Sequence, residues 1–286
     1  MENGCENTCW MAAELTDRMD ESVERVQRWL TDCVPHLSVR LTAVRNLRNG
    51  VEREVWDCSC RTKAGGLDAI LTLFKPGSLE TVNTNLPPEL VSEKCFLAMS
   101  ELPALGIPTP MVLGYAVSRG EAALLCERVA TSEWISGTRV AAVRILARLH
   151  NLHEFHLSRR LQELVSLSDP LEYRTTGGRA PRGRDKRLVH GDYFSKNILL
   201  VAGDLCVIDW ETFGWGDPMW DLGFLIGADH DLTDEEVEAV IAEYGSRAAI
   251  DRHRLMWHKR RWSDFWKARQ DKSSEETCAD HAVQRA

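Results

Sequence analysis

The sequence contains no long hydrophobic run: nowhere does it approach the roughly 18 uninterrupted apolar residues of a membrane span. It also lacks an excess of positive charge, because its formal net charge is -8 at pH 7. General binders of nucleic acids or of anionic membranes need a basic face, so both classes are disfavoured. Internal repeats and low-complexity segments are absent too. We therefore expect neither nucleic-acid nor membrane partners.

A disulfide framework is not expected either. The chain has nine cysteines, an odd number scattered mostly through apolar segments, which is typical of reduced thiols in a cytosolic protein. The N-terminus, MENGCENTCWMAAELTDRMD, has no basic region followed by an apolar core, so we expect no signal peptide. These features predict a cytoplasmic protein.

What the sequence does contain is the composition of a globular protein, with 44% hydrophobic and 27% charged residues. Hydrophobic periodicity predicts a helix over residues 11–34, five strands between residues 38 and 129, and a helix over residues 88–101. The pattern becomes mainly helical from about residue 139, and the polar tail beyond Asp271 is expected to fray. The fold class is therefore α+β, with two lobes. Residues 1–127 would form a helix, a five-stranded antiparallel sheet and one further helix, and residues 128–286 a helical lobe.

One loop combines three polar residues with an apolar strand. In LVHGDYFSKNILL (Leu188–Leu200), Asp192 follows His190 by two residues and precedes Asn197 by five, and a second segment, LCVIDWE, ends a predicted strand at Asp209. A hydroxyl that attacks a phosphoryl group needs a carboxylate to orient it, and Mg²⁺ on the phosphates needs oxygen ligands. Asp192 can supply the carboxylate, and Asn197 and Asp209 can supply the ligands if the hairpin between them returns Asp209 to the same edge. Either segment alone is equally well explained as a turn.

Taken together, HGDYFSKN and IDWETFGWGDPMWDLGFL resemble the catalytic loop and the metal-binding strand of the aminoglycoside phosphotransferase/choline kinase family, relatives of the protein kinases. The resemblance implies a bilobal protein-kinase-like fold, with a small antiparallel-sheet N-lobe and a mainly helical C-lobe. It further implies that Asp192 is the catalytic base and that Asn197 and Asp209 bind Mg²⁺. Asp221 and His190 would support the loop structurally.

The first lobe resembles the nucleotide-binding lobe of that family less closely. Lys75 stands where the family has a lysine that contacts the nucleotide phosphates, and Glu93 where it has the glutamate that pairs with this lysine. Isolated residues of these types are usually just solvated, so the pair alone is ambiguous. LLCERV resembles the hinge that holds adenine, here at Glu127 and Val129. The first two strands are not joined by a Gly-x-Gly-x-x-Gly loop. Backbone N–H groups of the turn at Asn49-Gly50 would therefore have to bind the nucleotide phosphates.

Four residues are candidates for binding the acceptor. Asp229 and Asp231 could attract an amine, and Trp257 and Trp262 could form an aromatic wall for a quaternary ammonium group. Packing of an amphipathic helix explains the two tryptophans equally well.

The resemblance therefore implies an ATP- and Mg²⁺-dependent O-phosphotransferase that modifies a hydroxyl of a small molecule, with GTP not excluded as the donor. The acceptor that we expect first is aminoglycoside-like or an amino sugar. A protein with such an acceptor would confer antibiotic resistance. A choline, ethanolamine or other metabolite kinase is the alternative within this class. A catalytically silent, kinase-like binding protein is the alternative from another class, although Asp192, Asn197, Asp209 and Lys75 are all present.

Overall fold

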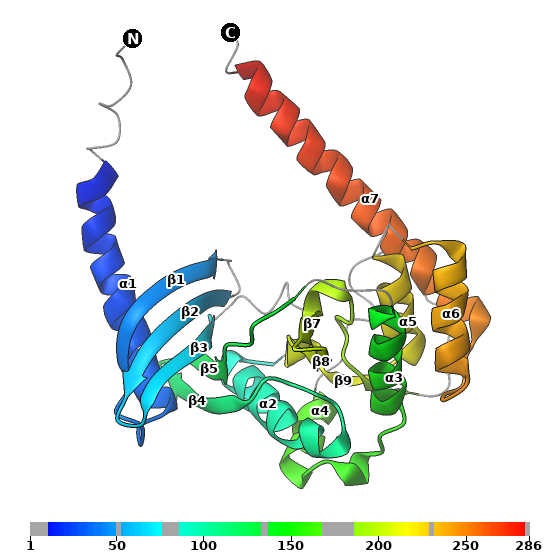
Figure 1. Ribbon diagram of the computed structural model, residues 1–286, viewed down its shortest axis with the longest axis horizontal. Helices are drawn as coiled ribbons and strands as arrows, with labels where there is room; N and C mark the ends of the chain where they lie inside the picture. The colour runs from blue at the N-terminus through cyan, green and yellow to red at the C-terminus, as the bar shows by residue number, and fades with distance from the viewer. Residues whose placement is uncertain are drawn as a thin grey trace. The chain divides into compact units, whose positions relative to one another are not determined.

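The computed structural model describes residues 11–49, 53–75, 86–132, 137–167, 186–228 and 232–283. The chain divides into two compact units (Figure 1). Unit 1 comprises Met1–Thr81, Pro87–Phe96 and Met111–Arg128, and unit 2 comprises Val82–Leu86, Leu97–Pro110 and Val129–Ala286. The expected fold class is confirmed, since the chain combines a five-stranded antiparallel sheet with a mainly helical part.

Unit 1 is built on this sheet, whose strand order is β1-β2-β3-β5-β4. Each neighbouring pair is antiparallel, and β2 and β3 pair without a bulge from Arg53↔Phe74 to Thr62↔Gly65. The strands are β1 (Arg40–Asn49), β2 (Arg53–Thr62), β3 (Gly65–Phe74), β4 (Val112–Ser118) and β5 (Glu121–Glu127).

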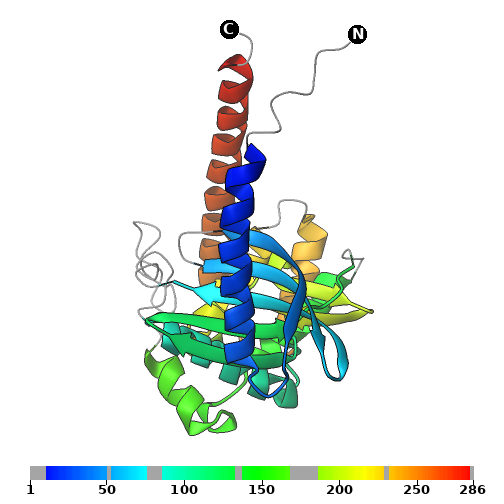
Figure 2. The same cartoon turned by 90° about the vertical axis from the view of Figure 1, so that its left-hand side faces the viewer.

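The two faces of the sheet carry different helices. Helix α1 (Met11–Cys33) lies across one face (Figure 2), where its Trp29 and Leu30 join a hydrophobic core with Leu71 of β3. Successive residues of a strand point to opposite faces. Ala116 packs against this core, so its neighbour Tyr115 points away from α1. The ring of Tyr115 lies 4.9 Å from that of Phe96 in helix α2 (Pro88–Glu101). Helix α2 therefore packs on the face opposite α1.

Unit 2 contains five helices and four short strands among the residues that the structure describes. The helices are α3 (Thr138–His150), α4 (Arg159–Leu167), α5 (Pro218–Gly227), α6 (Asp234–Gly245) and α7 (Arg252–Val283). The strands are β6 (Arg187–Val189), β7 (Ile198–Val201), β8 (Asp204–Val207) and β9 (Gly214–Gly216). Helix α7 continues past Asp271, where the sequence predicted a frayed tail, and it contains no glycine or proline that would end it.

Helices α5 and α7 pack closely because α5 has glycines on the facing side. A Cβ atom at Gly223 would lie 2.5 Å from Cβ of His258, and one at Gly227 would lie 2.5 Å from the backbone oxygen of Lys259. The N-cap residue of α5, Asp217, accepts hydrogen bonds from the backbone N–H of Met219 and from Arg254 of α7. The first turn of α5 is thus fixed to α7.

Within the part of the chain that the structure describes, no helix has both the length and the apolar character that crossing a membrane requires. The six cysteines whose side chains are described are all free thiols, as the composition predicted.

Candidate active site

The turn at the end of the motif HGDYFSKN holds Asp192 and Asn197 together. The amide nitrogen of Asn197 donates to Oδ2 of Asp192 at 2.8 Å and to its backbone oxygen at 2.9 Å. Both amide hydrogens are therefore used, which leaves the amide oxygen of Asn197 as the atom that can bind a cation. Asn197 is buried, while Asp192 is half-buried and so stays accessible to a substrate.

The β7–β8 hairpin brings Asp209 back to this turn. Its strands pair from Ile198↔Val207 to Val201↔Asp204, and the backbone N–H of Ile208 donates to the backbone oxygen of Asn197 at 2.9 Å. The residue before Asp209 is thereby bonded to the predicted metal ligand Asn197. Asp209 itself adopts a left-handed conformation, with φ of 70°. A non-glycine residue is uncommon there, and such positions cluster at functional sites.

Side chains satisfy all four backbone polar groups of His190 and Gly191. Asp221 accepts from the N–H of His190 at 2.7 Å and from that of Gly191 at 2.9 Å. Thr212 donates to the carbonyl of His190, and the indole N–H of Trp220 donates to that of Gly191. Gly191 has φ of +87°, and a Cβ atom there would lie 2.8 Å from Thr212, so this position requires glycine. The loop is thus held without help from a sheet.

The expected supports of the loop, His190 and Asp221, are fully buried. Nδ1 of His190 accepts from the N–H of Asp192 at 3.2 Å, so Nε2 carries the hydrogen and donates to the carbonyl of Ile208 at 2.9 Å. Burial lowers the pKa of His190 despite the nearby charges of Asp221 and Asp209, so the ring is neutral. Asp221 also contacts Nε2 of His150, whose Nδ1 lies 2.6 Å from the hydroxyl of Tyr244.

In unit 1, Lys75 forms an ion pair with Glu54 of β2 at 2.8 Å. Glu54 also binds Arg25 of α1 at 3.1 Å, and Arg25 in turn binds Glu121 at 3.0 Å. Burial opposes ionisation of Glu54, but hydrogen bonds from Lys75 and Trp56, together with the charges of Arg25 and Lys75, outweigh it and lower its pKa. The expected pairing of Lys75 with Glu93 stays a prediction.

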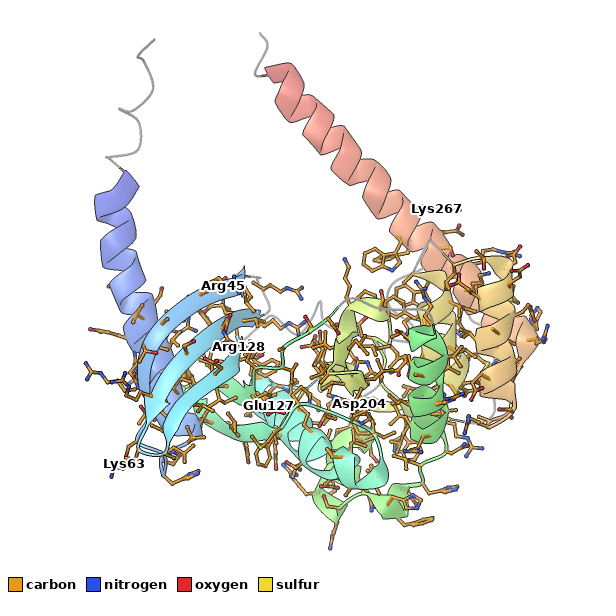
Figure 3. The ribbon with its side chains drawn as sticks, viewed as in Figure 1. Arg45, Lys63, Glu127, Arg128, Asp204 and Lys267 are labelled. Atoms are coloured by element: carbon orange, nitrogen blue, oxygen red, sulfur yellow. The ribbon has the colours of Figure 1, made fainter. Side chains whose placement is uncertain are left out.

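The expected hinge residues lie at the end of β5. Glu127 pairs with Met111 through its backbone N–H at 2.9 Å and through its side chain at 2.8 Å, and Val129 is half-buried. Between them lies Arg128, which is labelled in Figure 3. Its guanidinium forms ion pairs with both Asp57 and Asp68. The adenine contact expected at Glu127 and Val129 stays a prediction. Asn49 ends β1, but its side chain and Gly50 lie outside the described residues.

The structure describes two of the four candidates for binding the acceptor, Trp257 and Trp262. Trp262 stacks on Phe224 with ring centroids 3.7 Å apart, and the guanidinium of Arg261 lies 4.8 Å from the ring centre of Trp257. Helix packing therefore accounts for Trp262, and a cation of the chain already covers Trp257. The other two candidates, Asp229 and Asp231, lie outside the described residues.

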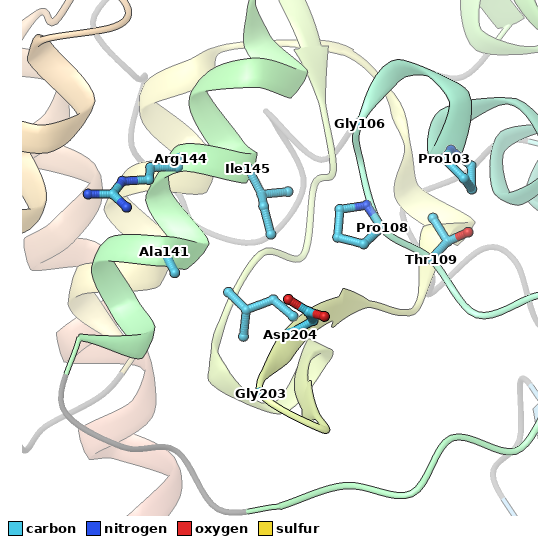
Figure 4. Close-up of a pocket in the computed structure, with 10 residues that line it drawn as sticks. Pro103, Gly106, Pro108, Thr109, Ala141, Arg144, Ile145, Gly203 and Asp204 are labelled. Atoms are coloured by element: carbon cyan, nitrogen blue, oxygen red, sulfur yellow. The ribbon is translucent and has the colours of Figure 1, made fainter.

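A separate hollow of about 610 Å³ lies in unit 2 beside the turn of the β7–β8 hairpin (Figure 4). It is lined mainly by apolar residues, among them Pro108, Ile145 and Leu205, and its rim includes Asp204. None of the predicted site residues lines it.

Sequence reasoning did not single out several side chains that hold the predicted site residues in place: Glu54, Thr212, Trp220 and Tyr244. Trp220 and Thr212 both lie inside the segment IDWETFGWGDPMWDLGFL, so their positions close to Asp221 and Asp209 in the sequence were a usable signal. The others contact residues far away in sequence, and their own sequence neighbourhoods give no such signal.

The fold is that of kinase-like phosphotransferases. Residues 141–258, which contain the catalytic loop, Asp209 and Asp221, match the model of the Phosphotransferase enzyme family. The resemblance seen in the sequence is thus confirmed, as is the expected class, a small-molecule kinase. No curated protein sequence matches the chain.

Solved structures show the same fold at low sequence identity. An aminoglycoside-3'-phosphotransferase of type VIII is 19% identical, with a TM-score of 0.54, over 84% of this chain and 97% of that one. An amicoumacin kinase solved with AMP-PNP and Ca²⁺ is 11% identical, with a TM-score of 0.52, over 86% of this chain and 87% of that one.

Proposed function

We propose that the protein transfers the γ-phosphoryl group of ATP to a hydroxyl of a small molecule, with Mg²⁺ as the metal. The observation that carries the proposal is the bonded arrangement of Asp192, Asn197 and the residue before Asp209, which lies within the segment that matches the phosphotransferase family. Nucleotide use is further supported by the structural neighbour solved with AMP-PNP.

The chemistry assigned to each residue follows from its surroundings. Asp192, oriented by Asn197, directs the acceptor hydroxyl and accepts its proton. The amide oxygen of Asn197 and the carboxylate of Asp209 are hard oxygen donors of the kind that Mg²⁺ prefers. When bound, Mg²⁺ neutralises charge on the phosphates. Asp221 keeps the loop backbone in place through its bonds with the N–H groups of His190 and Gly191.

The acceptor that we put first is aminoglycoside-like or an amino sugar, as the resemblance implies, and a structural neighbour is itself an aminoglycoside phosphotransferase. The packing of Trp257 and Trp262 gives no support to the choline alternative, because a quaternary ammonium group needs exposed aromatic faces.

The test is a screen with purified protein, Mg²⁺-ATP and three acceptor groups: aminoglycosides, choline-type amines and sugars. The variant Asp192→Ala should bind Mg²⁺-ATP but lose about 10²–10⁴-fold in phosphoryl transfer, the usual contribution of a general base. Asp204→Ala removes an exposed aspartate outside the site and serves as the control. Undiminished turnover by Asp192→Ala would show that the base is misassigned. ATP binding without turnover on any acceptor would favour a silent binding protein.

A further inference from the structure

The carboxylate of Asp221 is held from outside the catalytic loop as well as by the loop itself. Its Oδ1 accepts from the N–H of Gly191, and its Oδ2 accepts from the N–H of His190. Oδ2 also lies 3.2 Å from Nε2 of His150 in α3. Asp221 and His150 are 0% and 1% exposed, so solvent does not compete for this contact. The position of the carboxylate therefore depends on His150 too.

The ring of His150 is oriented from its other side by Tyr244 of α6. An ionised carboxylate only accepts hydrogen bonds, so Nε2 of His150 carries the hydrogen in its contact with Asp221. Nδ1 of the uncharged ring is then an acceptor, and it lies 2.6 Å from the hydroxyl of Tyr244. Burial, together with the charges of Asp221 and Asp217, raises the pKa of Tyr244. The hydroxyl therefore keeps its hydrogen and donates it to Nδ1.

These contacts form a continuous chain of hydrogen bonds that ends at the catalytic loop. The chain begins at Tyr244, passes through His150 and Asp221, and reaches the N–H of Gly191, the residue before Asp192. Its three side chains lie in unit 2 and are at most 1% exposed. Buried hydrogen bonds in a chain polarise one another, so removal of one member weakens the others.

Helices α3 and α6 also contact each other outside this chain. Arg144 of α3 forms an ion pair with Glu243 of α6 at 2.8 Å, and the side chain of Asn151, which follows α3, donates to the backbone oxygen of Arg247 at 3.0 Å. Apolar side chains of similar size in place of the tyrosine and the histidine would pack between the helices without the cost of burying polar groups. The polar chain is therefore better explained by its effect on Asp221 than by helix packing.

We propose that Tyr244 and His150 are positioning residues of phosphoryl transfer: the hydroxyl of Tyr244 orients the ring of His150, and the Nε2–H of His150 fixes the carboxylate of Asp221. The inference rests on the proposed phosphotransferase function and adds two residues from other helices to the support of the loop. Both act on Asp192 through Asp221 and the backbone of Gly191. They should therefore affect the rate of transfer and leave the binding of ATP almost unchanged.

The first test measures kcat and the KM for ATP in three variants. Tyr244→Phe removes only a hydroxyl, and kcat should fall about 3- to 10-fold, the factor that one neutral hydrogen bond contributes. His150→Leu removes both bonds of the ring, and kcat should fall about 10- to 100-fold, because one of them is to a charged group. His150→Gln should lose no more than Tyr244→Phe does, since its NH₂ group can take the place of Nε2. The KM for ATP should change less than about twofold in all three.

Val240→Ala is the matched control, because it removes buried volume one turn before Tyr244 in the same helix but no member of the chain. It should lower the melting temperature and leave kcat within about twofold of that of the unmodified protein. Equal kcat values for His150→Gln and His150→Leu, or an unchanged kcat in Tyr244→Phe, would show that these hydrogen bonds do not position the loop. A raised KM for ATP at unchanged kcat would overturn the inference too.

A second measurement does not depend on turnover. Amide hydrogen exchange, followed by NMR, reports how tightly Asp221 holds the N–H groups of His190 and Gly191. In Tyr244→Phe both should exchange about 3- to 10-fold faster relative to the slowest amides of unit 2, which report global unfolding. In Val240→Ala this ratio should not change, and an unchanged ratio in Tyr244→Phe would refute the positioning role. Protein that shows the expected exchange but transfers phosphate to no acceptor would instead refute the proposed function itself.

Discussion

The sharpest test of the loop architecture is Asp221→Asn, which changes one atom of a fully buried side chain. In the native protein, Oδ2 of Asp221 accepts from the N–H of His190 and from His150, and Oδ1 accepts from the N–H of Gly191. An asparagine must place its NH₂ group at one of these two positions. Because an NH₂ group cannot accept a hydrogen bond, one N–H of the loop then faces another donor.

The expected cost can be estimated from these contacts. The better orientation of the amide keeps the bonds to His190 and His150 and gives up the one to Gly191. Losing a hydrogen bond to a charged group costs about 1.5–3 kcal/mol, partly offset because the buried side chain no longer carries a charge. The change in unfolding free energy should therefore be at most a few kcal/mol. Catalysis should suffer more, since Gly191 directly precedes Asp192.

We expect kcat to fall about 100-fold, equivalent to about 2.7 kcal/mol in the barrier, with little change in the KM for ATP. The assay is coupled ADP release with an acceptor from the screen, measured well below the melting temperature of the variant. Val240→Ala is a suitable control, because it removes buried volume from α6 without touching the loop. If Asp221→Asn kept kcat within twofold while folded, the bracing role of the carboxylate would be wrong.

Two further predictions concern packing and pH. Trp262→Ala should lower the free energy of unfolding by about 3–5 kcal/mol, because it removes an indole stacked on Phe224, and chemical denaturation measures this; a raised acceptor KM with unchanged stability would favour the aromatic wall instead. Because the pKa of Glu54 is lowered in the folded state, its ionisation stabilises the protein above the usual carboxyl pKa, and this stability is lost as the pH falls through the folded-state value. Glu54→Gln should therefore reduce the melting temperature more at pH 7 than at pH 4, and an equal reduction at both values would contradict the reasoning.

The proximity of the candidate site residues could be predicted from the sequence where it depends on short-range contacts. Asp192 and Asn197 are five residues apart, and a single turn makes them bond. Asp209 required only that two short apolar segments form a hairpin, and its register then followed from their lengths. The strands and helices of unit 1 were predictable for the same reason, since alternation and turn residues are local signals.

The surroundings of Lys75 were not predictable in this way. The position of Lys75 at the end of a strand suggested a functional residue. Its surroundings, however, depend on which face of the sheet α1 covers, and the sequence does not give this. Glu54 and Glu121 meet Arg25 from 29 and 96 residues away in sequence, and no local pattern links them.

Helix α5 connects these long-range contacts to the catalytic loop. Its N-cap, Asp217, binds Arg254 and His258 of α7, and Asp221, one turn later, holds the backbone of His190 and Gly191. Helix α7 is therefore coupled by these hydrogen bonds, through a single turn of α5, to the residue before Asp192. The glycines at 223 and 227 make this coupling stiff, because they let the two helix backbones approach without intervening side chains. Gly191 keeps its left-handed conformation next to Asp192 because glycine adopts it without steric cost, and Asp221, Trp220 and Thr212 hold the backbone of the loop.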